Sequence, residues 1–456
     1  MSGIAGILGH GQKDRVSRML DRLVHRGPAG REILETDVAT LGVVWTRTQA
    51  DARSSLTANH VAQDRAGAEH LAQAQVVDGR LILTRDALGV APLYYGYTRE
   101  GLLCFASEVK ALQEVTSDVQ EFPPGHRFDG ERWAAYFRLE KKPPLSDSPE
   151  AIAKELRRRL ATAVEQRIQE AEVGSWLSGG LDSSTIAALA RPHVERLYTF
   201  AVGLEGAPDL EYARVVARFL GAEHHEQVVQ MEDLLAVLPD VIYHLESFDA
   251  LLVRSSLTNY LVARAASEYT PVAFSGEGGD ELFAGYAYLK SLDPADLPDE
   301  LIDITGRLHN TALQRVDRCA SAHGLVVHVP FLDPDVVDYA LRIPAMLKLH
   351  DGVEKWILRR AMDGLLPESI LTRAKAKFWE GANVGDLLAQ YAEERISDRE
   401  FARERRLPDG QILNTKEELL YYRIFREYFP DLRDLSWVGR TKGAPVQPVE
   451  EGGEDD

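Results

Sequence analysis

The run VGSWLSGGLDSSTIAAL (residues 173–189) constrains the fold more than any other stretch of the chain. A short apolar segment breaks at Ser178-Gly179-Gly180 and is followed at once by a helix-forming sequence, which indicates a buried strand, a tight loop and a helix in succession. Such a unit directs several backbone N–H groups and the positive end of a helix to one point, which suits an anion. The run therefore predicts a phosphate-binding loop.

The side chains of this loop refine the prediction. Ser178, Ser183 and Ser184 can donate hydrogen bonds, whereas Asp182 repels a phosphate unless a cation lies between them, which favours a magnesium-bound nucleotide. The lysine of the Walker loop G-x-x-x-x-G-K-[ST] is missing, which argues against the usual ATPase. On the loop alone, a tight turn in which Asp182 and Ser183 only cap the helix remains an alternative.

The sequence pattern changes once along the chain and divides it into two regions. The first ~140 residues have strand-like runs separated by turns, and strands alternate with helices after the proline-rich segment 141–150, as in a parallel α/β sheet. We expect domains at 1–140 and 149–440 and a disordered acidic tail at 441–456. The expected strands are 3–8, 40–45, 80–84, 92–97, 102–106, 175–177 and 197–202, and the expected helices are 149–169, 183–190 and 210–220.

Composition limits the class of protein. A chain of 456 residues, 45% hydrophobic and 27% charged, is typical of a globular protein of two domains. It has no apolar stretch near the ~18 residues of a membrane span and no export pattern, so we expect a cytoplasmic protein. A net charge of −19 argues against nucleic acid as a partner. Cys104 and Cys319 lack a metal-ligand spacing and are expected to be core thiols.

A second motif, downstream of the first, indicates the protein family that the chain resembles. FSGEGGDELFAGY (residues 274–286) follows SGGLDSS in the order and spacing of the asparagine synthetases, which the chain resembles; SGGLDSS itself resembles the pyrophosphate loop of the N-type ATP pyrophosphatases. The resemblance covers nearly the whole chain except the tail. It implies an N-terminal α+β sandwich like that of the Ntn hydrolases, followed by a Rossmann-like α/β domain. Further resembling segments are 197–226, 240–249, 329–340 and 373–385.

The resemblance also implies cofactors and roles. ATP and Mg²⁺ are expected, with Asp182 and Asp280 as metal-anchoring carboxylates. Glu277 is expected as general base and Tyr286 as its orienting partner. The further catalytic candidates are Lys375, which would face the adenylating phosphates, and Arg254 and Arg315, near the acceptor. The expected nucleotide-binding residues are Leu177, Ser178, Gly179, Gly180, Asp182, Ser183, Ser184, Val202, Ser275 and Gly276.

The N-terminus departs from the pattern. MSGIAGILG resembles the start of a class II glutamine amidotransferase, in which an N-terminal cysteine attacks glutamine, but this chain has Ser2 there. Between Thr48 and Arg80 the family's R-L-S-I, N-G-E-x-Y-N and G-S-D segments are absent, and they carry the glutamine-binding and oxyanion-hole groups. We expect a degenerate glutaminase domain and ammonia as the nitrogen source.

Substrate choice is the second departure. Leu251 and Leu252 stand where many asparagine synthetases have threonines. Ala312 and Ile304 stand where an aspartate and a lysine are usual, so an acceptor other than aspartate is an alternative. The leading hypothesis is an AMP-forming amide ligase that amidates a small carboxylate, aspartate first. A ligase resembling the β-lactam synthetases and a nucleotide-binding pseudoenzyme are the alternatives, and a homodimer is left open.

Overall fold

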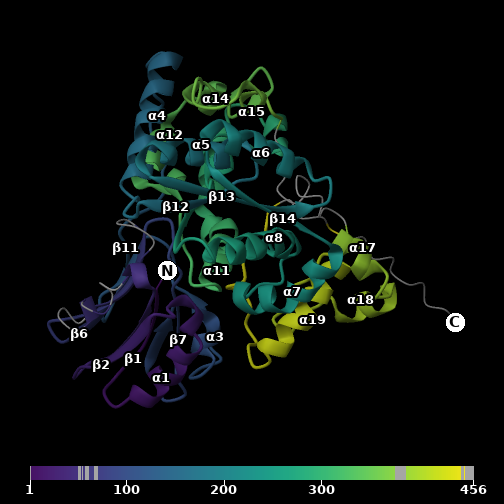
Figure 1. Ribbon diagram of the computed structural model, residues 1–456. Coiled ribbons are helices and arrows are strands. Elements are labelled where there is room, and N and C mark those ends of the chain that lie inside the picture. Colours follow the sequence, from purple (N-terminus) through teal and green to yellow (C-terminus); the bar gives the residue numbers. More distant parts are fainter. Residues whose placement is uncertain are drawn as a thin grey trace.

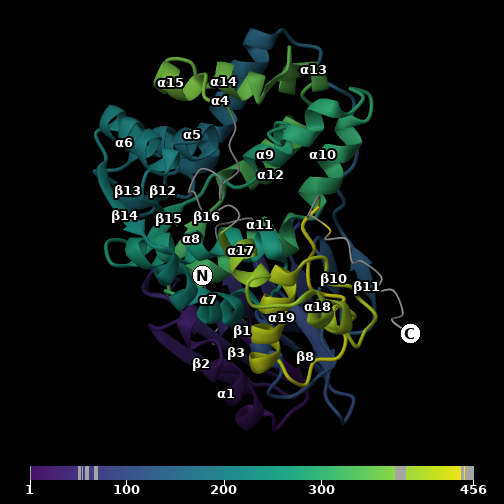
Figure 2. The same cartoon turned by 90° about the vertical axis from the view of Figure 1, so that its right-hand side faces the viewer.

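A computed structural model describes residues 2–49, 53, 55–56, 61–65, 70–374, 387–442 and 446, and its ribbon falls into two parts (Figure 1). The N-terminal part is rich in strands, and the larger part that follows is built around a parallel sheet. The N-terminus lies where the two parts meet, in both views (Figures 1 and 2). No helix within the described residues combines the length and the apolar character needed to cross a membrane.

The N-terminal part is a sandwich of two antiparallel sheets. One has the strand order β2-β3-β1-β8-β7-β9 and the other β11-β10-β6-β5-β4. Their facing side chains, among them Ile4, Leu41, Leu83 and Phe105, form a core of their own. The elements are β1 (Gly3–Leu8), α1 (Lys13–Asp21), β2 (Gly30–Glu35), β3 (Ala39–Trp45), β4 (Val61–Arg65), β5 (Leu71–Val77), β6 (Arg80–Arg85), β7 (Tyr94–Tyr97), β8 (Leu103–Ala106), α3 (Val109–Leu112), β9 (Gln120–Glu121), β10 (His126–Phe128) and β11 (Trp133–Ala135).

All five strands expected in this part are present, with ends shifted by up to two residues. The sequence prediction missed β2, β4, β5 and β9 to β11. The strands β9, β10 and β11 are two or three residues long, and so short a run shows no alternation of apolar and polar side chains. The strands β4 and β5 lie in the segment after Thr48 where the family motifs are missing, so the sandwich persists where those motifs do not.

The helix expected from Ser148-Pro149 is present. The Ser148 hydroxyl accepts a hydrogen bond from the Ala151 amide (3.3 Å), and Pro149 is the first residue of α4 (Pro149–Glu165), four residues shorter than predicted. The parallel strands are β12 (Glu172–Trp176), β13 (Arg196–Leu204), β14 (Glu223–Val229), β15 (Val272–Phe274) and β16 (Val326–His328). The helices around them that matter below are α5 (Leu181–Ala190), α6 (Pro208–Leu220), α7 (Met231–Leu245), α8 (Ala250–Ser267), α9 (Gly279–Leu282), α11 (Ala312–Ser321), α14 (Trp356–Ala361) and α19 (Lys416–Tyr428).

Helices cover both faces of this sheet. Helices α5 and α6 lie on the upper face, and α8 and α11 lie between the lower face and the N-terminal sandwich (Figures 1 and 2). The strand order is β14-β13-β12-β15-β16. After β12, the chain therefore adds β13 and β14 on one side of β12, and then adds β15 and β16 on the other side. The junction of β12 and β15 is therefore a topological switch point, where ligands bind in sheets of this kind.

Candidate active site

Both sequence motifs emerge at the switch point. The SGGLDSS loop follows β12, and the SGEGGDE loop follows β15, whose residue Phe274 is paired with Ser175 of β12. The two loops touch, since a β-carbon on Gly276 would lie 2.7 Å from the Ser183 amide nitrogen and 2.8 Å from the Asp182 carbonyl carbon. The two motifs thus meet at the carboxyl edge of the sheet.

The first loop is held by its own hydroxyls. The Ser183 hydroxyl donates to the Gly180 carbonyl (3.2 Å) and accepts from the Ser178 amide (3.3 Å). Gly179 has φ +67°, and a β-carbon there would lie 2.4 Å from the carbonyl carbon of Tyr212 in α6. Only glycine fits this backbone and this space. By contrast, Ser184 is buried on α5 with no exposed surface.

One aspartate from each motif points at the same atom. The Nζ of Lys355 lies 2.5 Å from Asp182 Oδ2 and 2.6 Å from Asp280 Oδ1. The side chains are 13% exposed for Asp182, 17% for Asp280 and 2% for Lys355, so the cluster is sheltered but reachable from the cleft. The structure brings the two predicted carboxylates together, and their role as metal anchors stays a prediction. The sequence analysis missed the lysine, which stands between β18 (Val353–Glu354) and α14, outside both motifs.

Cations gather beside the first loop. A pocket next to Ser178, Gly180 and Ser183 is also lined by Lys355, Arg359 and Arg373. The Arg373 guanidinium donates to Asp209 Oδ1 (2.5 Å) and to the Ser178 carbonyl (3.3 Å), and it lies over the Tyr212 ring at 4.0 Å. Backbone N–H groups and three cationic side chains suit a polyphosphate. The predicted Lys375 lies outside the described residues.

A cleft of about 780 Å³, including its open mouth, adjoins this pocket, a size usual for small-molecule sites. Its apolar lining comes from β12, β13, the residue after β12 and Val262 of α8, and its polar lining comes from α6, α8, α11 and the two loops. It includes the predicted Leu177, Val202, Ser275 and Gly276. The full lining is Trp176, Leu177, Ser178, Asp182, Ser183, Phe200, Ala201, Val202, Asp209, Thr258, Asn259, Val262, Ser275, Gly276, Glu277, Asp280 and Arg315.

Glu277 and Arg315 form an ion pair in this cleft. The Arg315 Nη2 lies 2.5 Å from Glu277 Oε1, and the side chains are 13% and 18% exposed. Tyr286, predicted to orient Glu277, instead donates its hydroxyl to the buried Glu281. Burial, and then the neighbouring Asp280, raise the pKa of Glu281 to about 7. The structure therefore joins Glu277 to Arg315 and Tyr286 to Glu281.

Arg254, another predicted catalytic residue, is not among the residues that line the cleft in the described part of the chain. It lies on α8 and forms a buried ion pair with Glu417 of α19. The observed contact of Arg254 is thus a buried ion pair, and its catalytic role stays a prediction.

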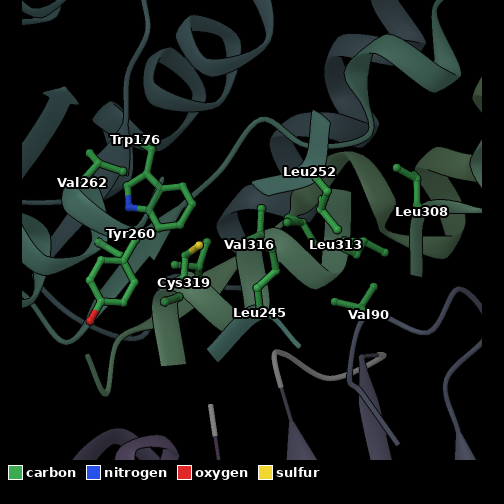
Figure 3. Close-up of a cluster of buried hydrophobic side chains, with 14 of the residues drawn as sticks. Val90, Trp176, Leu245, Leu252, Tyr260, Val262, Leu308, Leu313, Val316 and Cys319 are labelled. Carbon is green, nitrogen blue, oxygen red and sulfur yellow. The ribbon is translucent and has the colours of Figure 1, made fainter. Parts of the chain in front are cut away.

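The apolar residues at the presumed acceptor positions pack in the interior. Leu252 belongs to a cluster with Leu308, Leu313 and Val316, beside Val90 of the N-terminal part (Figure 3). Ile304 belongs to a separate small cluster with Leu297 and Leu301. Neither lines the cleft described above. Leu252 and Ile304 therefore fill core space, and they give no support to the prediction of an apolar acceptor pocket.

Ser2, at the position of the amidotransferase nucleophile, is 1% exposed. Its hydroxyl donates to the Gln63 carbonyl of β4 (3.1 Å), and its own carbonyl accepts from Arg26 Nε (2.9 Å). The site is thus packed inside the domain junction.

Comparisons with known proteins agree with this arrangement of an amidotransferase-like sandwich followed by an α/β domain. The family model for asparagine synthase matches residues 155–301 and 294–447, and the model for the glutamine amidotransferase domain matches residues 61–149. The chain belongs to the asparagine synthase family. The fold class predicted from the sequence and the resemblance on which it rested are confirmed.

Among curated relatives, the probable glutamine-hydrolysing asparagine synthetase of Schizosaccharomyces pombe is 36% identical over 415 residues, which cover 81% of this chain and 74% of the relative. Asparagine synthetase B of Escherichia coli, also glutamine-hydrolysing, is 35% identical over 373 residues, 76% of this chain and 67% of the relative. The solved structure of NMN synthetase from Francisella tularensis is 13% identical to this chain. The match covers 62% of this chain and 94% of that one, with a TM-score of 0.31.

Proposed function

We propose that the protein is an ATP-dependent amide ligase that adenylates the side-chain carboxylate of aspartate, releases pyrophosphate and then amidates the adenylate with ammonia to give asparagine and AMP. The observation that carries this proposal is the meeting of Asp182 and Asp280 beside the cationic pocket of Lys355, Arg359 and Arg373. Family membership and the glutamine-hydrolysing asparagine synthetases among the relatives support it.

The donor set fits magnesium. Both carboxylates offer hard oxygens aimed at one point, and Mg²⁺ is commonly held by one or two carboxylates together with substrate phosphates. Asp182 and Asp280 would hold the ion, which when bound neutralises charge on the phosphates. The described residues contain no group of three or more histidines, cysteines, aspartates or glutamates placed to hold a metal by themselves.

The chain's own residues then have separate tasks. The N–H groups at the start of α5 and the side chains of Lys355 and Arg373 face the place of the phosphates, where negative charge grows as pyrophosphate leaves. Glu277, which is ion-paired with Arg315, is placed to accept a proton from the attacking amine. Arg315 can also bind an acceptor carboxylate, since a guanidinium matches that group's geometry.

The acceptor is proposed to be aspartate because the cleft that holds Glu277 also has polar side chains in its lining, namely Thr258, Asn259 and Arg315. Leu252 and Ile304, two of the residues that first suggested another acid, pack elsewhere. A different carboxylate, as for a ligase of the β-lactam synthetase kind, remains an outcome of the test below.

The test incubates the full chain with ATP, Mg²⁺, ammonium and aspartate and measures pyrophosphate, AMP and asparagine, expected in equal amounts. Asp182→Asn should abolish all three products. Asp398→Asn is the matched control, because Asp398 also pairs with a lysine, Lys416 at 2.6 Å, but is 93% exposed. Turnover with another acid alone would replace aspartate as the substrate, and no pyrophosphate with any acid would leave only a nucleotide-binding protein.

Ammonia rather than glutamine is proposed as the nitrogen source. A serine hydroxyl is a weaker nucleophile than a thiolate at neutral pH, and the Ser2 hydroxyl is already hydrogen-bonded to the Gln63 carbonyl. Ammonium should therefore support turnover and glutamine should not, with no glutamate released from glutamine. Glutamate release that Ser2→Ala abolishes would show an active glutaminase and overturn this part of the proposal.

A further inference from the structure

Lys355 occupies the point between the two acidic residues of the proposed ligase site. Its Nζ is 2.5 Å from Asp182 Oδ2 and 2.6 Å from Asp280 Oδ1. We propose that this ammonium holds the metal position in the nucleotide-free protein, so that a divalent cation binds only together with the nucleotide, to whose phosphates Lys355 then moves. This inference rests on the proposed function, because it assigns the order in which that site is filled.

The surroundings are shaped for this contact. A β-carbon on Gly285 would lie 1.9 Å from Asp280 Oδ1 and 2.3 Å from Lys355 Cε, so only glycine leaves room for the lysine to reach the carboxylate. Likewise, a β-carbon on Gly279 would lie 2.5 Å from the Asp182 carboxyl carbon. The glycines of the second motif therefore admit the Asp–Lys–Asp cluster as well as a ligand.

The backbone of Lys355 is itself unusual. It has φ +57° at the N-cap of α14, a conformation that costs energy for a residue with a side chain. Its amide donates to the Phe283 carbonyl (3.2 Å), and its carbonyl accepts from the Arg359 amide (3.0 Å). These bonds fix the lysine at the end of the second motif, and strain of this kind gathers at functional sites.

Electrostatics make the lysine and a metal ion alternatives. Two carboxylates facing one point repel each other unless a cation lies between them, and the Lys355 ammonium supplies one positive charge in a sheltered place. A divalent cation at the same point would lie within a few ångströms of the ammonium and be repelled by it. One of the two cations must therefore leave before the other can bind.

The nucleotide provides the place to which the lysine moves. Lys355 also lines the cationic pocket beside Ser178, Gly180 and Ser183, so its flexible side chain can follow a phosphate without a change of the main chain. Two carboxylates alone do not complete the coordination shell of Mg²⁺, and the incoming phosphates supply further oxygen ligands. Loading of metal and nucleotide together follows from the geometry.

The experiment titrates the full chain with Mn²⁺, without nucleotide, and measures free Mn²⁺ by electron paramagnetic resonance. Lys355→Met should lower the Kd for one Mn²⁺ by about tenfold or more, because a charge within about 4–6 Å shifts an ionic equilibrium by about 1–3 powers of ten. Adding Asp182→Asn to this variant should remove the gain in affinity for Mn²⁺. Lys355→Arg, which keeps the positive charge, should bind Mn²⁺ as weakly as the unaltered chain.

Arg359→Met is the matched control. It removes one cation from the same pocket, but the hydrogen bonds of Arg359 go to Glu354 and to the carbonyls of Leu371 and Arg373. Its Kd for Mn²⁺ should stay near that of the unaltered chain. Circular dichroism confirms that each variant is folded.

Two results would overturn the inference: tight binding of one Mn²⁺ by the unaltered chain without nucleotide, or no gain in a folded Lys355→Met variant. The first needs no variant, so the inference remains testable even if Lys355→Met does not fold. Failure of the proposed ligase function would give a different result from failure of the inference on Lys355. The chain would then form no AMP with any acid, while the nucleotide-free titration would still report on Lys355.

Discussion

Arg26 and Asp317 form a buried two-pronged ion pair across the junction of the two domains. The guanidinium nitrogens of Arg26 lie 2.8 and 2.9 Å from the two carboxylate oxygens of Asp317 on α11, and both side chains are at most 2% exposed. Arg315, two residues away on the same helix, reaches Glu277 in the cleft. The N-terminal domain thus braces a helix that contributes to the candidate site.

The first prediction concerns this pair. Arg26→Met should lower the free energy of unfolding by about 3–5 kcal/mol, because Asp317 is left as a buried charge without its main partner. The double variant Arg26→Met with Asp317→Leu should be less destabilised than the single one, because one charge of each sign is removed. Urea unfolding followed by tryptophan fluorescence measures both, and equal losses in the two variants would show that the charge balance does not matter.

Three histidines at the same junction predict a loss of stability in acid. Burial lowers the pKa of His25, lowers that of His244 to about 2 and lowers that of His323 to about 4, with nearby cations such as Lys110, Arg26 and Arg264 adding to the effect. Below pH 6.5 these histidines bind protons in the unfolded chain and stay neutral in the folded one. The free energy of unfolding should therefore fall as the pH drops from about 6.5.

Urea unfolding between pH 7 and pH 5 measures this slope, to which each histidine adds about 1.4 kcal/mol per pH unit while its protonation differs between the two states. His323→Gln should flatten the slope, and His10→Gln, at an exposed position, should leave it unchanged. A slope that His323→Gln does not alter would contradict the assignment of proton uptake to this histidine.

Much of this site was predictable because both motifs are local. Glycines and acids next to a buried strand are visible in the sequence, and parallel strands bring their carboxyl ends to one edge, so Asp182 and Asp280 were correctly paired. Lys355 was not predictable in this way. It lies at the short junction of β18 and α14 with a left-handed backbone conformation, which no sequence pattern predicts. Arg373 lies in segment 373–385, which resembles the family, but its contacts with Asp209 and Ser178 depend on tertiary packing.

The third prediction tests the loop backbone. Gly179→Ala should lower ATP-dependent pyrophosphate release by about 100-fold, since a methyl group there meets the Tyr212 backbone at 2.4 Å and a φ of +67° disfavours alanine. Gly306→Ala is the matched control, since Gly306 ends the helix Leu297–Gly306 outside the cleft, has no positive φ, and a β-carbon there would meet only Leu139 Cδ1, at 3.9 Å. Equal activity in both variants would mean that the shape of the loop is not critical.

The last prediction concerns Glu281, which accepts the Tyr286 hydroxyl beside Asp280. Because burial raises its pKa to about 7 in the folded protein, from about 4.5, the stability that it contributes is present below pH 4.5 and is lost as the pH rises through 7. Glu281→Gln cannot ionise, so its free energy of unfolding relative to the unaltered chain should rise between pH 5 and pH 8, by up to about 1.4 kcal/mol per pH unit.

Glu300 provides the matched control, because it also accepts a tyrosine hydroxyl, that of Tyr288, but lies 2.7 Å from Lys442. Hydrogen bonds from Lys442 and Tyr288 outweigh burial and lower the pKa of Glu300, so its contribution is lost as the pH falls. Glu300→Gln should therefore show no rise between pH 5 and pH 8. The same pH dependence in both variants would mean that Glu281 titrates as an ordinary carboxyl and that the acidic cluster does not hold it protonated near neutral pH.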